Sequence, residues 1–155
     1  MKTISNSQLT IRVSPHGAEL CNIVCNGKEY LWQADPSFWK RHSPVLFPIV
    51  GSVWENEYRI DGATYNLTQH GFARDMNFEL IREQPDELRY RLADNEESRR
   101  RYPFPFRLEI GYRIQGKQIE VLWEVKNTGD KELHFQIGAH PAFYFPAFDM
   151  KSNER

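Results

Sequence analysis

The chain has 155 residues, a net charge of −1, 40% hydrophobic residues and 26% charged residues. These values are typical of one globular domain that is large enough to bury a core. A charge so close to zero excludes the strongly basic face that nucleic-acid binding requires. Because no apolar stretch reaches the length of a membrane-spanning helix, we also expect no membrane partner.

The first segment predicts a meander of short strands. Residues 8–13 alternate apolar and polar side chains with period two, and residues 14–17 form a turn. Residues 18–24 form a second strand pattern, and residues 28–32 form a returning one. Asn26 and Gly27 between them predict a hairpin turn, since both tolerate positive φ.

The next segment changes character. Residues 35–39 are expected to form a short helical turn, with Pro36 at a favourable first position. Residues 44–51 are apolar but contain Pro44 and Pro48, and proline cannot donate to a ladder. We therefore expect an irregular buried connection, which is the kind of loop that often lines a site.

Strand patterns then continue to the end of the chain. Asp61-Gly62 predicts a second hairpin, between residues 57–60 and 63–67. The remaining strand patterns are residues 78–82, 87–92, 107–114, 118–127 and 132–137, with a charged helical patch at 95–101. Several short strands with hairpin turns and 14% aromatic residues predict an all-β fold, an antiparallel β-sandwich or barrel, over residues 1–155.

Two cysteines indicate the compartment. A disulfide between Cys21 and Cys25 would be strained over so short a span, and neither residue has zinc-ligand spacing around it. Residues 1–10 show no signal-peptide pattern. We therefore expect free thiols, no metal and a cytoplasmic protein.

Two of the five histidines stand out. His70 and His140 each lie in a loop rich in Gly, Ala and Phe at the end of a strand pattern, where small residues let a ligand approach the backbone. Arg74 follows His70 by four positions, within reach of an anionic or hydroxyl group. By contrast, His16 is expected to be exposed in a turn, His42 is ambiguous, and His134 is expected to be structural in a strand. The pattern alone leaves a catalytic and a structural role open for His70 and His140.

The same loops carry a family resemblance. The segments QHGFARD at 69–75 and GAHPAF at 138–143 resemble the two signature loops of the aldose 1-epimerase (galactose mutarotase-like) family. Its LacX-like and hexose-6-phosphate mutarotase branch is the most similar. FPIVG at 47–51 resembles the buried loop before the first signature, and YPFPF at 102–106 resembles the approach to the second. Order and spacing agree, so the resemblance covers essentially the whole chain.

The resemblance implies a β-supersandwich that binds a free aldohexose, with or without a phosphate group, and needs no cofactor. It also implies a mechanism in which a carboxylate takes the proton of the anomeric hydroxyl and a histidine protonates the ring oxygen. By motif position His140 is the acid and His70 holds the anomeric region. Arg74 contacts hydroxyls or an anionic group, and Phe72 and Phe143 supply apolar walls.

Two departures qualify this expectation. The family often has an arginine where this chain has Ser52, and Arg41 or Arg59 need not replace it. Family members are about twice this length, and their catalytic glutamate lies in the C-terminal part. None of the local candidates matches its motif, and all fit a strand's solvent face better: Glu109, Glu120, Glu124 and Glu132.

Three hypotheses follow from these observations. The chain is the N-terminal part of a mutarotase, a non-catalytic sugar-binding sandwich, or a plain interaction domain, against which the two histidine loops argue. A sandwich without its second part would expose strand edges, so we expect a homodimer through them.

Overall fold

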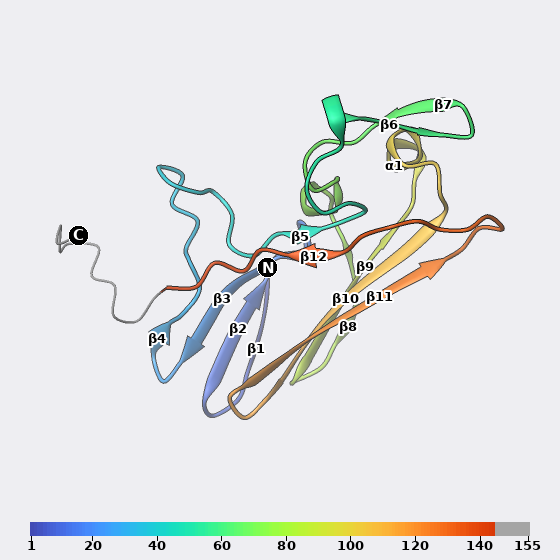
Figure 1. Ribbon diagram of the computed structural model, residues 1–155. Helices are drawn as coiled ribbons and strands as arrows, with labels where there is room; N and C mark the ends of the chain where they lie inside the picture. Colours follow the sequence, from blue (N-terminus) through green and yellow to red (C-terminus); the bar gives the residue numbers. More distant parts are fainter. Residues whose placement is uncertain (145–155) are drawn as a thin grey trace.

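Two four-stranded antiparallel sheets form the body of the computed structural model, which describes residues 1–144 (Figure 1). The first sheet has the order β1-β2-β3-β4. It comprises β1 (Lys2–Ser5), β2 (Leu9–Val13), β3 (Leu20–Cys25) and β4 (Lys28–Glu29). The sequence pattern missed β1, whose residues are mostly polar. Ile4, its one buried residue, lies opposite Ile11 of β2, so the pairing with β2 holds this polar segment as a strand.

The second sheet has the order β11-β10-β9-β8. Its strands are β8 (Glu79–Glu83), β9 (Glu87–Ala93), β10 (Phe106–Gln115) and β11 (Gln118–Asn127). β10 is buried along almost its whole length because β9 and β11 flank it. The hydroxyl of Tyr112 in β10 donates to the carbonyl of Ala18, beside β3, at 2.7 Å, which ties the two sheets together.

Short elements cap one end of the sheets (Figure 1). The hairpin of β6 (Glu57–Ile60) and β7 (Ala63–Asn66) lies beside α1 (Glu96–Arg101). The helix begins at Asn95, whose side chain and that of Ser98 form a reciprocal capping box. The 3₁₀ turns η1 and η2 span Trp54–Asn56 and Ala73–Asp75. The two-residue strands β5 (Val45–Leu46) and β12 (Gly138–Ala139) pair with each other.

An aromatic cluster fills the core beneath these short elements. Phe47 lies at its centre, with ring centroids 5.1 Å from Phe106, 6.1 Å from Tyr102 and 6.5 Å from Phe72. All four rings are at most 2% exposed. The segment 44–51 is therefore the buried, irregular connection that its two prolines predicted.

The all-β prediction is confirmed, and residues 35–39 form the expected turn, in which the amides of Phe38 and Trp39 donate to the carbonyl of Asp35. Two local expectations need correction. Only two of residues 28–32 are in a strand. Residues 132–137 form no strand, because they make only isolated hydrogen bonds to neighbouring segments and no ladder. The hydroxyl of Tyr102 donates to the carbonyl of His134, and the amide of Gln136 donates to the carbonyl of Pro48. His134 is accordingly exposed and lies outside any strand. Among residues 1–144, no helix has the length and apolarity needed to cross a bilayer.

Candidate functional site

His70 and His140 come together although they lie far apart in the sequence. Their ring centroids are 4.8 Å apart, and the ring planes meet at 84°. His70 precedes η2, and His140 directly follows β12. The two loops singled out by sequence thus lie side by side in the structure.

A single segment, residues 44–51, holds both histidines. The amide of His140 donates to the carbonyl of Pro44 at 3.1 Å, next to the β5–β12 pairing. On the other side, the amide of His70 donates to the carbonyl of Gly51 at 2.7 Å, and the amide of Phe47 donates to the carbonyl of His70 at 3.2 Å. Backbone hydrogen bonds to this one segment therefore fix the distance between the two histidines.

The protonation of His70 follows from its surroundings. Its Nδ1 accepts the amide proton of Gly51 at 3.0 Å, so the neutral ring carries its proton on Nε2. Burial, the charge of Arg74 and the neighbouring His140 lower the pKa of His70. At neutral pH the ring is therefore uncharged and presents an N–H donor. His140 is exposed, so its ring is open to solvent.

Arg74 lies near the pair within a small charged group. Its Nη2 donates to the carbonyl of Gln69 at 2.6 Å, and its Nε lies 3.6 Å from Asp75 Oδ2. That buried Nε has no hydrogen-bond partner among residues 1–144. Burial and the nearby Arg41 lower the pKa of Arg74, and Asp75 opposes them.

Arg41 reaches this group from a distant part of the chain, where it pairs with Asp75 Oδ1 at 2.8 Å. Nothing in its sequence neighbourhood indicated that position. Arg59 lies on the exposed side of β6.

The two predicted aromatic walls lie in different environments. Phe72 is 1% exposed and belongs to the aromatic core, so it supports the His70 loop from beneath. Phe143 is 61% exposed and pairs through its backbone with Leu31. The apolar run after residue 144 lies outside the described residues.

No carboxylate from residues 1–144 contacts the ring of His70 or His140; within these residues, His42 and His134 are the histidines that lie near one. Glu120 and Glu124 are exposed on β11, as expected, whereas Glu132 is not in a strand. Glu109 differs from the expectation. It is 6% exposed because Arg91 and Arg107 cover it, with N–O distances of 3.0 and 3.2 Å.

An open apolar groove of about 690 Å³ lies between the two sheets. Its walls include Tyr112 from β10, Val121 and Trp123 from β11, and Phe143. The apolar side chains of β11 in this groove are only partly covered, with Val121 48% and Trp123 41% exposed.

The chain is also similar to known proteins. A family model described as aldose 1-epimerase matches residues 1–154. The protein LacX of Lactococcus lactis subsp. lactis is 33% identical over 163 aligned residues, which cover 97% of this chain and 53% of that protein.

Solved structures are similar as well. A galactose mutarotase related enzyme from Lactobacillus acidophilus superposes with a TM-score of 0.94 at 40% identity, covering 98% of this chain and 51% of that one. A galactose mutarotase-like protein from Lactobacillus casei gives 0.89 at 35% identity, covering 92% and 49%. The chain thus spans about half the length of these relatives.

Proposed function

Because the chain belongs to the aldose 1-epimerase family, we propose that its His70–His140 pair binds a free aldose and supplies the acid for interconversion of its anomers. The observation that supports this most directly is the meeting of the two rings, which two separate loops bring to a centroid distance of 4.8 Å. The family and the all-β fold support the substrate class.

The proposed chemistry requires one acid and one base on a hemiacetal. His140, which is open to solvent, gives a proton to the ring oxygen as the bond from that oxygen to the anomeric carbon breaks. His70 donates from Nε2 to an oxygen of the anomeric region, because its Nδ1 is occupied by Gly51. A carboxylate takes the proton of the anomeric hydroxyl. The aldehyde carbon then rotates, and the ring recloses with the opposite configuration.

We propose that this base is not among residues 1–155, so the chain alone does not accelerate mutarotation. Two observations support this. No described carboxylate contacts either imidazole, and the chain spans about half the length of its relatives. The same observations favour a second candidate function, a carbohydrate-binding module without catalysis.

An anionic substituent on the sugar is the finer substrate hypothesis. Arg74 and Arg41 both pair with Asp75, and no group in the described residues accepts a hydrogen bond from the buried Nε of Arg74. A phosphate oxygen could accept from both guanidinium groups, because arginine suits bidentate contacts to phosphate. A phosphorylated hexose should therefore bind more tightly than its neutral parent.

We also propose that the isolated chain forms a homodimer and works in the cytoplasm. The first proposal is supported by the apolar groove and by exposed Val121 and Trp123 on an edge strand. The second is supported by Cys21 and Cys25, which are free thiols on one strand.

Polarimetry of freshly dissolved α-galactose and α-glucose tests the catalytic part. We expect the 155-residue chain to leave the spontaneous rate unchanged, and the His140→Gln variant to behave in the same way. Acceleration by the chain that disappears in His140→Gln would contradict the proposal that the base is missing. It would show that the chain by itself assembles both the acid and the base.

A further inference from the structure

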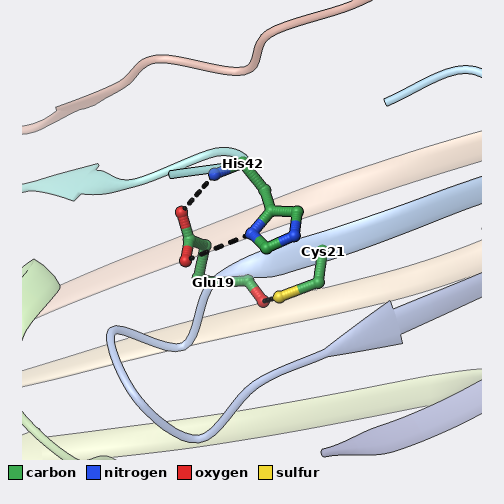
Figure 2. Close-up of side chains that lie close together, drawn as sticks. All are labelled: Glu19, Cys21 and His42. Carbon is green, nitrogen blue, oxygen red and sulfur yellow. Dashed lines mark hydrogen bonds and ion pairs between the residues drawn. The ribbon is translucent and has the colours of Figure 1, made fainter. Parts of the chain in front are cut away.

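Three side chains of metal-binding type, none of them from the histidine pair, meet beside β3. They are Glu19, Cys21 and His42, and Figure 2 shows the imidazole beside the carboxylate and close to the thiol. One ligand atom from each residue lies within 4.8 Å of the other two. The sequence spacing around the cysteines gave no sign of this group, because His42 arrives from a loop distant in the chain.

Backbone contacts already orient the carboxylate. Glu19 Oε1 accepts the amide protons of His42 at 2.9 Å and of Ser43 at 3.0 Å. Its other oxygen, Oε2, lies 3.8 Å from His42 Nδ1 (Figure 2). Such contacts to the remaining atoms of a ligand hold it in position for an ion.

The imidazole and the thiol have bonding capacity to spare. His42 Nδ1 is buried and has no hydrogen-bond partner in the described part of the chain. Buried polar atoms are nearly always satisfied, so an unpaired ring nitrogen that faces a carboxylate needs an explanation. Cys21 Sγ makes a weak bond to the carbonyl of Glu19 at 3.3 Å. A thiol is a poor donor, and a metal ion could replace this contact.

We propose that Glu19, Cys21 and His42 form a binding site for a divalent transition-metal ion of the zinc class. Thiolate, imidazole and carboxylate are the ligands that zinc takes in proteins, and three protein ligands leave the fourth tetrahedral position to water. One thiolate and one carboxylate neutralise the two charges of the ion. When the metal–sulfur bond forms, the thiol proton passes to solvent.

The ligand atoms need to move only a short way. Around a tetrahedral zinc ion, bond lengths of about 2.0–2.3 Å place ligand atoms about 3.3–3.7 Å apart. Separations of at most 4.8 Å can close by side-chain rotation. The side chain of His42 is 23% exposed, which gives an ion a path from solvent.

The position of the site indicates a structural role. The carbonyl of His42 accepts the amide proton of Ala142 at 3.1 Å. Two residues further on, the carbonyl of Pro44 accepts the amide proton of His140. An ion bound to His42 would therefore join the start of β3 to the loop that carries the His140 segment. This inference does not depend on the sugar chemistry.

Cobalt(II) titration of the full chain tests the site, because Co²⁺ replaces zinc and reports its ligands by absorption. We expect a near-ultraviolet thiolate-to-cobalt band together with visible bands of tetrahedral geometry, and displacement of both by Zn²⁺. The matched variants are Cys21→Ser, which should lose the thiolate band, and Cys25→Ser, which should keep it because Cys25 lies outside the cluster.

Two further variants separate a metal site from a simple polar cluster. Glu19→Gln keeps an oxygen that can accept from the amides of His42 and Ser43. If Glu19 only caps these amides, the substitution should change the stability little. If Glu19 is a metal ligand, as proposed, Co²⁺ affinity should fall at least tenfold. His42→Gln should weaken Co²⁺ at least tenfold, and His16→Gln should not, because His16 is exposed elsewhere. Absence of the thiolate band in the unmodified chain, or its survival in folded Cys21→Ser, would overturn the proposal.

Discussion

At the scale of single residues, the backbone around His70 decides how the site is held. His70 and Gly71 have φ of 65° and 69°, in the left-handed region that side chains rarely adopt. This conformation brings Gly71 against the 47–48 peptide. A Cβ at Gly71 would lie 2.6 Å from the carbonyl carbon of Phe47 and 2.7 Å from Pro48 Cδ. Only glycine therefore fits at position 71, between His70 and the 44–51 segment that positions it.

Replacing this glycine should be costly. We expect Gly71→Ala to lower the free energy of unfolding by about 3 kcal/mol, because left-handed strain adds to a backbone clash. Gly62→Ala is the matched control, since Gly62 has φ of 80° but no atom within 4 Å of an added Cβ. It should cost about 1 kcal/mol. Equal losses for the two variants in urea unfolding would contradict the close approach at Gly71.

The pKa of His70 offers a second test at this scale. Burial contributes most to lowering it, and the charges of Arg74 and His140 add to the effect. We expect the pKa of His70, followed by NMR of the imidazole signals, to lie below its ordinary value of about 6.5 and to rise in Arg74→Gln. Arg59→Gln, on the exposed side of β6, should leave it unchanged. An unchanged pKa in Arg74→Gln would show that the guanidinium does not act on the ring.

At the scale of elements, the outer face of β9 and β10 carries a ladder of ion pairs. Glu87 is 4% exposed and accepts hydrogen bonds from Arg113 at 2.8 Å and Arg82 at 3.3 Å. Burial by itself would raise the pKa of Glu87, but the hydrogen bonds and charges of these arginines outweigh it and lower the pKa overall. The carboxylate thus holds β8, β9 and β10 together.

This ladder predicts a pH dependence of stability. A carboxyl group with a lowered folded pKa contributes stability above the unfolded value of about 4, and this is lost as the pH falls through the folded value. Glu87→Gln should therefore lower the free energy of unfolding by about 2 kcal/mol at neutral pH, and the difference should shrink in acid. Glu120→Gln on exposed β11 should have little effect. Thermal unfolding between pH 7 and pH 3 measures both.

The elements also show how far sequence patterns reach. Turn signals such as Asn26-Gly27 and Asp61-Gly62 located their hairpins because such turns are decided locally. Residues 132–137 had the alternation of a strand but form none, because alternation says which side chains could be buried, not whether a partner strand lies alongside. The prediction for β1 was wrong in the opposite sense. Its polar residues show no strand pattern, but pairing with β2 holds them in a strand.

Part of the candidate site could likewise be predicted from the sequence and part could not. The loops of His70 and His140 could be found by sequence, and the structure brings their rings together. The arrival of Arg41 beside Asp75, the burial of Phe72 and the meeting of Glu19, Cys21 and His42 depend on long-range packing that no local pattern encodes.

At the scale of the whole molecule, the open groove between the sheets is the dominant feature. An apolar cavity of about 690 Å³ beside exposed Val121 and Trp123 is unusual for an isolated monomer. The relatives are about twice as long. We expect the isolated chain to cover this face with a second copy of itself.

Self-association can be measured by light scattering coupled to size exclusion. We predict a dimer whose dissociation constant rises at least tenfold in Trp123→Ser. The control is Trp54→Ser, because Trp54 is 86% exposed on η1 and does not line the groove. A monomer at high concentration, or equal effects of the two variants, would contradict dimerisation through this face.

NMR titration of the ¹⁵N-labelled imidazoles with galactose tests whether His70 and His140 together form a sugar site. We predict that the signals of His70 and His140 shift together and saturate, that His16 stays unchanged, and that the His70 shift disappears in folded His140→Gln. If neither ring responds to galactose, glucose or their 6-phosphates while the chain remains folded, the histidine pair is not a sugar site and the proposed function is wrong.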